Sequence, residues 1–144
     1  MAAINPYLNF NGNTEAAFSF YKSVFGGNLS LMRWSDNPQC GEMSENDKNK
    51  VMHVALPIGN GNVLMASDSL ESMGQKLTEG NNVQIAIAPE SKEEANRLFN
   101  GLSAGGKVEM PLQDMFWGGY FGSFTDKFGV HWLVNYDNGQ KHSN

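Results

Sequence analysis

Residues 13–27 read NTEAAFSFYKSVFGG, and this stretch decides the fold because a variant of it occurs a second time. Asn13 is a residue type that caps helices, and apolar side chains then recur at helical spacing until a Gly-Gly pair ends the pattern. Residues 91–106 read SKEEANRLFNGLSAGG, in which Ser91 opens a capping box and the same helical spacing again runs into a Gly-Gly pair. We therefore expect two equivalent helices in one chain.

Segments with the pattern of β-strands flank both predicted helices in the same order. In the first copy they are residues 4–10, 29–34, 51–58 and 63–67, and in the second they are residues 83–88, a strand starting at Val108, and residues 120–125 and 130–136. The first copy closes on a hairpin with the Asn-Gly turn signal. The order is βαβββ twice, which predicts an α+β fold of two tandem modules forming a curved mixed sheet cup with the helices outside.

The predicted organisation is a single domain covering residues 1–144. Its first module spans residues 1–68, a linker spans 69–82, and its second module spans 83–137. Residues 36–50 are polar and show no periodicity, so we expect a mobile loop or lid there. A generic α+β sandwich without a repeat is the alternative.

The composition points away from nucleic acids and membranes. The chain has 144 residues, a net charge of −5 and 40% hydrophobic residues, and its basic residues form no stripe that could neutralise phosphates. No apolar run is long enough to span a membrane, and the first residues lack the pattern of a secretion signal. Cys40 is the only cysteine, which excludes an intramolecular disulfide and a cysteine-based metal cluster. We expect a cytoplasmic protein.

Several stretches resemble the vicinal oxygen chelate superfamily, the group of glyoxalase I, bleomycin-resistance proteins and extradiol dioxygenases. The opening at residues 12–27 carries the first resemblance, and MHVAL at 52–56, LMASD at 64–68, DMFWG at 114–118 and TDKFGVHW at 125–132 resemble its PhnB-like branch. The resemblance covers nearly the whole chain and implies paired βαβββ modules and a homodimer. Proteins of this branch are sometimes labelled methyltransferases, but this sequence has no nucleotide-binding βαβ unit with a glycine-rich turn.

The resemblance also implies four metal-ligand positions, one on the first and one on the last strand of each module, filled in the enzymes by His, Gln or Glu. Alignment on the helix caps and hairpin turns places Pro6, Met65, Gln84 and Leu133 there, and a one-residue shift replaces Pro6 by Asn5. A hard divalent ion needs oxygen or imidazole donors, and among the four aligned residues only Gln84 offers one. We therefore expect no metal at this site and no cofactor.

Two histidines are candidates for catalytic proton transfer. His53 lies in an otherwise apolar strand, either as a general base or hydrogen-bond donor in the cup or as a core histidine satisfied by a neighbour. His131 shares a strand face with Leu133, two residues on, so it either lines the pocket or lies at the sheet rim facing water. Asp68 and Asp126 follow strands near turns, where turn or cap roles are expected.

Residues 115–121 read MFWGGYF, the most unusual stretch in the chain. Dense aromatic residues beside paired glycines suit a loop that lays flat rings against a planar ligand, and core packing between the modules is the alternative. The candidate ligand-binding residues are Tyr7, Met65, Gln84, Phe116, Trp117, Phe121, Trp132 and Leu133.

Three functions fit these observations. The first, which we predict, is a metal-free small-molecule binding protein of the glyoxalase/bleomycin-resistance type, whose apolar cup takes an aromatic or amphiphilic ligand. The second is an enzyme of the same superfamily that acts by proton transfer through His53 or His131, or through a non-standard metal site. The third is a structural or interaction protein with a vestigial cleft. The sequence leaves the identity of the ligand open.

Overall fold

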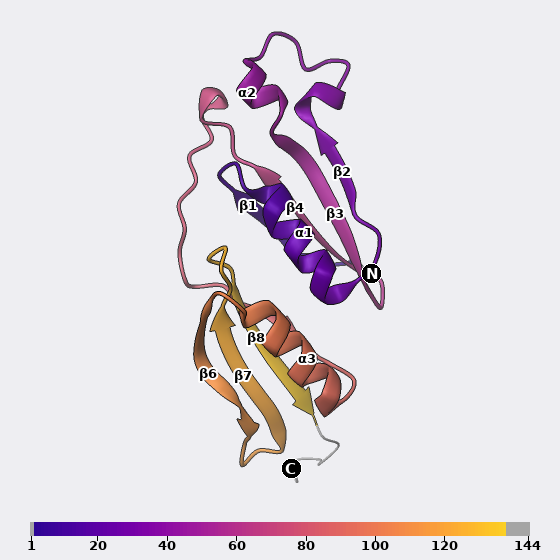
Figure 1. The fold of residues 1–144 in the computed structure, drawn as a ribbon, viewed down its shortest axis with the longest axis vertical. Helices are drawn as coiled ribbons and strands as arrows, with labels where there is room; N and C mark the ends of the chain where they lie inside the picture. The colour runs from indigo at the N-terminus through magenta and orange to yellow at the C-terminus, as the bar shows by residue number, and fades with distance from the viewer. Residues whose placement is uncertain (1, 138–144) are drawn as a thin grey trace. The chain divides into compact units, whose positions relative to one another are not determined.

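The computed structural model describes residues 2–137 and divides the chain into two compact units, one ending at Thr78 and one beginning at Glu79. Each unit contains a four-stranded mixed sheet and one long helix (Figure 1). The element order is βαβββ in both units once the short helices are set aside. The predicted α+β fold of tandem βαβββ modules is therefore confirmed.

The sheet of the first unit has the strand order β1-β4-β3-β2, with β1 parallel to β4 and the other neighbours antiparallel. The elements are β1 (Tyr7–Phe10), α1 (Thr14–Phe25), β2 (Ser30–Arg33), η1 (Trp34–Asp36), α2 (Glu45–Lys48), β3 (Val51–Gly59), β4 (Asn62–Asp68) and η2 (Glu71–Met73). Asn60 and Gly61 between β3 and β4 have φ angles of 53° and 78°, as the predicted Asn-Gly turn requires.

The sheet of the second unit has the corresponding order β5-β8-β7-β6, with β5 parallel to β8. The elements are β5 (Ile85–Ile87), α3 (Lys92–Ser103), β6 (Lys107–Asp114), β7 (Gly119–Thr125) and β8 (His131–Asp137). Helices α1 and α3 both have 12 residues. Ser91 caps α3 as predicted, because its hydroxyl accepts the N–H of Glu94 at 3.0 Å.

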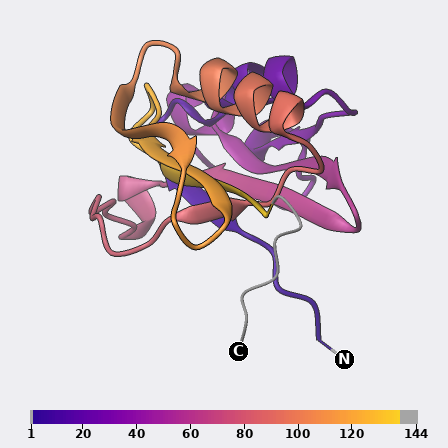
Figure 2. The same cartoon turned by 90° about the horizontal axis from the view of Figure 1, so that it is seen from below.

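Each long helix covers one face of its own sheet, as Figures 1 and 2 show for α3 over the sheet of the second unit. In the first unit the buried side chains include Ala17, Phe18, Tyr21, Val54, Leu56, Leu64 and Ala66. In the second they include Ala95, Leu98, Phe99, Leu102, Phe124, Trp132 and Val134. The ring centroids of Phe99 and Phe124 are 4.9 Å apart in an edge-to-face arrangement, so α3 packs directly against β7.

We call the sheet face opposite the long helix the open face of each unit. Successive strand residues point to opposite sides, so the buried core residues identify the open-face residues between them. In β4, Met65 lies between the buried Leu64 and Ala66. In β8, Leu133 lies between the buried Trp132 and Val134.

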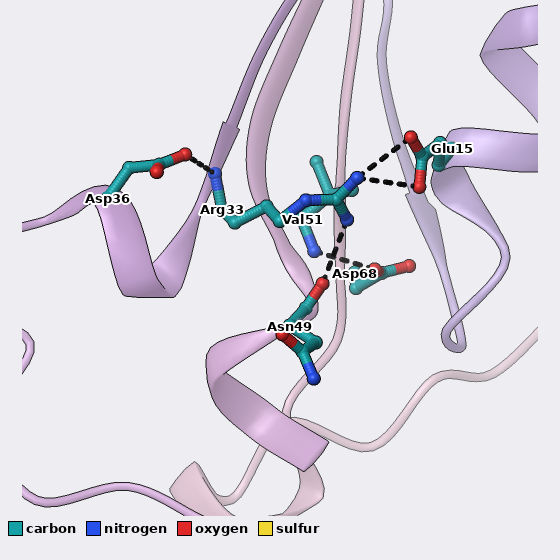
Figure 3. Close-up of polar contacts among 6 residues, drawn as sticks. All are labelled: Glu15, Arg33, Asp36, Asn49, Val51 and Asp68. Carbon is teal, nitrogen blue, oxygen red and sulfur yellow. Dashed lines mark hydrogen bonds and ion pairs between the residues drawn. The ribbon is translucent and has the colours of Figure 1, made fainter. Parts of the chain in front are cut away.

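The buried carboxylate of Asp68, at the end of β4, ties the first unit together. Its Oδ1 accepts hydrogen bonds from the N–H of Gly12 at 3.0 Å and from the N–H and hydroxyl of Thr14 at 3.1 and 2.6 Å. Its Oδ2 accepts the N–H of Val51 at 2.8 Å (Figure 3). The predicted cap role of Asp68 is confirmed. Asn13 occupies the N-cap position of α1 as predicted, but its side chain makes no capping hydrogen bond.

A second polar cluster surrounds Arg33 at the end of β2 (Figure 3). Its guanidinium donates to both carboxylate oxygens of Glu15 at 2.8 Å and to the carbonyl of Asn49 at 3.0 Å. Its backbone N–H donates to Asp36 at 2.8 Å. The hydrogen bond to Glu15 raises the pKa of Arg33, so the guanidinium stays charged and links α1 to the segment that precedes β3.

Residues 36–50, predicted as a mobile loop, contain the short helix α2. Ser44 caps it by accepting the N–H of Asp47 at 3.1 Å, and the Asp47 carboxylate accepts the hydroxyl of Ser72 at 2.7 Å. The α2 sequence, ENDK, has no apolar side chain that could have produced a helical pattern. The predicted loop therefore contains one short helix that its sequence pattern did not indicate.

Replacing Asp68 should destabilise the first unit. Asp68→Ala leaves the N–H groups of Gly12, Thr14 and Val51 without their acceptor, and each buried unpaired group costs about 1–3 kcal/mol. We expect the free energy of unfolding to fall by roughly 2–4 kcal/mol in urea titrations followed by circular dichroism. Asp36→Ala is the control, because its carboxylate is exposed and accepts a single backbone bond. Equal stability of the two variants would contradict the role given to Asp68.

Candidate functional site

The open face of the first unit brings together Tyr7, Met32, His53 and Met65. Tyr7 pairs with Met65 across β1 and β4, and Met32 pairs with His53 across β2 and β3. Tyr7 and Met32 are 46% and 44% exposed, and the other two are half-buried. Three predicted site residues therefore share this face. Met32 was missed because only the β2–β3 register places it opposite His53.

Tyr7 and His53 form a polar pair within this apolar face. The Tyr7 hydroxyl lies 3.3 Å from Nδ1 of His53, and the two ring centroids are 5.8 Å apart. Across residues 2–137, Nε2 of His53 has no hydrogen-bond partner. An imidazole with one nitrogen engaged and the other open can exchange a proton with a bound molecule or hydrogen-bond to it. The structure thus favours the open-face interpretation of His53 over the core one.

The open face of the second unit is built from Phe121, Ser123, Leu133 and Asn135. Phe121 pairs with Asn135, and Ser123 pairs with Leu133, across β7 and β8. Trp117 lies in the turn before β7, and its ring is edge-to-face with that of Phe121, with the ring centroids 6.1 Å apart. Two of the predicted ligand-binding aromatic residues and Leu133 are therefore neighbours in this unit.

Gly119 makes room for the Trp117 ring. A Cβ at position 119 would collide with Cζ3 and Cη2 of the indole, and it would lie 2.7 Å from Oδ1 of Asn135. The indole therefore lies over Gly119, close to the Asn135 amide. This explains why a glycine follows Trp117-Gly118 at the first position of β7.

The amide oxygen of Asn135 is buried without a hydrogen-bond partner. Within residues 2–137 the only other buried side-chain N or O atom in this condition is Nε1 of Trp34. A buried acceptor without a partner lowers the stability of the fold by about 1–3 kcal/mol, because it loses its hydrogen bonds to water and forms none in the protein. Asn135 follows Leu133 by two residues in β8 and so shares its face, but no sequence pattern indicates that the amide is unsatisfied.

Both ring nitrogens of His131 are engaged in the second unit. Nδ1 lies 2.8 Å from the hydroxyl of Thr125, and Nε2 lies 3.1 Å from the carbonyl oxygen of Gly80. The Thr125 hydroxyl also donates to Glu109, whose Oε1 is 3.9 Å from Nδ1 of His131. His131 therefore has no open ring nitrogen for a ligand, in contrast to His53.

The remaining predicted residues are dispersed. Trp132 is fully buried on the helix side of β8, where its indole N–H donates to Asp126 at 2.8 Å, so it cannot touch a ligand on the open face. Phe116 is fully exposed in the turn before β7. Gln84 is exposed and precedes β5. The aromatic character of Trp132 suggested a binding role, but the alternation of β8 assigns it to the core.

The register corrects the predicted metal-ligand alignment in the first unit. Tyr7 pairs with Met65, so Pro6 is out of phase with the open face, and Asn5, one residue earlier, is in phase. The one-residue shift to Asn5 is therefore the correct choice. In the second unit Ala86 pairs with Leu133, which puts Gln84 in phase as predicted.

These positions do not fit a hard divalent cation. The side-chain oxygen of Asn5 already accepts the N–H of Val63 at 2.9 Å, and Met65 supplies only a soft thioether. Leu133 has no donor atom. Among residues 2–137, no group of three or more His, Cys, Asp or Glu side chains could hold a metal ion. Of the four positions only Asn5 and Gln84 carry an oxygen donor, so they do not fit the metal site that the resemblance implies.

The paired βαβββ units have the fold of PhnB-like proteins and of the glyoxalase/bleomycin-resistance/dioxygenase group. A glyoxalase/bleomycin resistance protein/dioxygenase family enzyme from Burkholderia phytofirmans PsJN shares the fold, with a TM-score of 0.63 at 17% identity over 94% of this chain and 99% of the other. The family model described as 3-demethylubiquinone-9 3-methyltransferase matches residues 2–135, and the chain belongs to this family.

Individual relatives agree with this assignment. Protein YjdN from Escherichia coli K12 is 31% identical over 137 residues, which cover 92% of this chain and 93% of the relative. The crystal structure of PA1353 from Pseudomonas aeruginosa has a TM-score of 0.83 and 41% identity, covering 95% of this chain and 98% of that one. A PhnB protein from Bacillus cereus, titled a putative 3-demethylubiquinone-9 3-methyltransferase, has a TM-score of 0.71 and 27% identity, covering 94% and 99%. None of the helices within residues 2–137 is long and apolar enough to cross a membrane.

Gly119→Ala should displace the Trp117 ring without unfolding the second unit. The new Cβ would collide with a side chain that can rotate, so we expect a stability loss below about 1 kcal/mol. In ¹H–¹⁵N spectra the indole signal of Trp117 should move, whereas the signals of Trp34 and Trp132 should not.

Gly122→Ala is the matched comparison for this variant. Its Cβ would lie 2.9 Å from two backbone atoms, Leu112 N and Met110 O, which cannot rotate away. We expect it to cost about 2 kcal/mol or more. An unmoved Trp117 signal in Gly119→Ala would show that the indole does not occupy the space over Gly119.

Proposed function

We propose that this protein binds small molecules, as a member of the glyoxalase/bleomycin-resistance type, through the open faces of its two sheets. The observation that carries the proposal is the set of aromatic and methionine side chains that the long helices leave uncovered, with Tyr7 and Met32 close to half exposed. A sheet face of this kind normally needs apolar cover, and a ligand can supply it.

The polar groups on these faces suggest what kind of ligand is taken. The first unit offers the Tyr7–His53 pair, and the second offers the hydroxyl of Ser123 and the amide of Asn135. These hydroxyl, imidazole and amide groups are few and lie among apolar side chains, which suits a flat aromatic or amphiphilic molecule better than a multiply charged one. We further propose a cytoplasmic homodimer, on the resemblance to the superfamily alone.

Methyl transfer is not part of the proposal. The family model's description names that activity, but no strand-to-helix turn in residues 2–137 carries the Gly-x-Gly-x-x-Gly pattern of a nucleotide-binding βαβ unit. What the open faces offer is apolar side chains with a few hydrogen-bonding groups among them.

Binding can be tested with 2-naphthol, a flat amphiphilic probe, in titrations followed by methionine methyl NMR signals. Met65→Ala should weaken binding about fivefold, because roughly 1 kcal/mol of apolar contact is lost. Met73→Ala is the matched control, since Met73 is 57% exposed in η2 and belongs to neither open face. Equal affinities of the two variants, or no shift of the Met32 and Met65 signals in the wild type, would contradict the proposal.

A second candidate function is proton transfer by His53. It is favoured by one observation, the open Nε2 on a ring whose Nδ1 is held by Tyr7. Such a ring could remove a proton next to the carbonyl group of a bound ligand. His131 is not a candidate on this ground, because both its nitrogens are engaged.

Hydrogen–deuterium exchange of acetophenone in D₂O separates the two candidates. A pure binding protein should leave the methyl exchange rate at its buffer value. Exchange accelerated by the wild type, reduced at least a hundredfold in His53→Ala and retained in His131→Ala, would establish the enzyme instead. Proton NMR of the methyl signal over time measures the rate.

A further inference from the structure

The unpartnered amide of Asn135 and the Trp117 ring beside it belong to the same corner of the second open face. Oδ1 of Asn135 is completely buried, and it accepts no hydrogen bond. The ring of Trp117 lies over Gly119, at the point where a Cβ would be 2.7 Å from that oxygen. The indole presents its carbon edge here, at Cζ3 and Cη2, so it cannot satisfy the acceptor.

Two glycines follow Trp117 in the turn before β7. Gly118 has a φ angle of 97°, in the region that favours glycine, and the indole occupies the space that a Cβ at position 119 would take. The centroids of the Trp117 and Phe121 rings lie 6.1 Å apart in an edge-to-face arrangement. A rotation of Trp117 would uncover both the space above Gly119 and the Asn135 oxygen.

We propose that Asn135 and Trp117 form a ligand subsite for a flat ring that carries an N–H or O–H donor on its edge. The donor bonds to Oδ1 of Asn135, and the ring takes the space over Gly119 that the Trp117 indole vacates. Stacking against Trp117 and Phe121 covers the ring faces. This inference rests on the proposed binding function and names the ligand chemistry of the second unit.

The polarity of the free atom decides the class of ligand. An amide oxygen accepts hydrogen bonds and repels carboxylates and other acceptors. A ring with a carboxylate on its edge would therefore leave the oxygen unsatisfied and add repulsion. Neutral phenols, indoles and ring amides satisfy it.

The test compares indole with benzofuran, which has the same shape but an oxygen in place of the N–H. Titrations of the ¹⁵N-labelled full chain are followed at the Trp117 indole signal and the Asn135 side-chain amide. We expect the wild type to bind indole about fivefold more tightly than benzofuran, which corresponds to one hydrogen bond of about 1 kcal/mol. Asn135→Leu should lose this preference, and Asn135→Asp, which retains an acceptor oxygen, should keep it.

Gln113→Leu is the matched control. Gln113 lies on β6 and pairs with Phe121, so its amide is also a neighbour of the Phe121 ring. This amide is exposed to water, so we expect its loss to leave the preference for indole over benzofuran unchanged. Asn135→Leu should also have an unfolding temperature no lower than the wild type, because it removes an unsatisfied group. A markedly lower temperature would show that the amide is structural and would overturn the subsite.

The outcomes separate this subsite from the general proposal. Equal affinities for indole and benzofuran at the open face would contradict the subsite proposal but not the proposal that the protein binds small molecules. If neither indole nor benzofuran shifts any open-face signal of the second unit, the subsite proposal is wrong. If 2-naphthol also shifts no signal of the first unit, the proposed binding function is wrong as well.

Discussion

The alternation of side chains along the strands, with one sheet face committed to a helix, is the constraint on which both units depend. In β4 it buries Leu64 and Ala66 against α1 and leaves Met65 on the open face. A slip of one residue would bury Met65 and expose Leu64, whose burial contributes about 2 kcal/mol. The register that builds the core therefore also selects the side chains that can meet a ligand.

Local sequence signals were sufficient for the two long helices and the strands, and insufficient for the short helices and for the pairing of the strands. The helices, their Gly-Gly ends and the Asn-Gly hairpin follow from residues close together in the chain, so they could be predicted. Whether Asn5 or Pro6 lies on the same sheet face as Met65 depends on the parallel pairing of β1 with β4. These segments are almost 60 residues apart, so no local pattern indicates their register. A turn or cap role could be predicted for Asp68, but not that it would cap α1, because Thr14 lies 54 residues before it in the chain.

The candidate site shows the same division. Tyr7, His53 and Met65 could be found because a motif or a strand phase marked each of them. Trp132 was assigned to the site for its aromatic ring, although its neighbour Leu133 already occupied the opposite phase of β8. The buried, unsatisfied oxygen of Asn135 depends on where the Trp117 ring lies, and that position follows from Gly119 and a turn geometry that the sequence does not specify.

The two copies of one framework carry different chemistry on their open faces: thioethers with a Tyr–His pair in one, and aromatic rings with an amide in the other. The most direct measurement is chemical-shift mapping of the whole chain with a flat aromatic ligand. We expect perturbations that alternate along β4 and β8, strong at Met65, Leu133 and Asn135 and weak at Leu64, Ala66 and Val134. Perturbations without this alternation, or concentrated on α1 and α3, would contradict binding at the open faces.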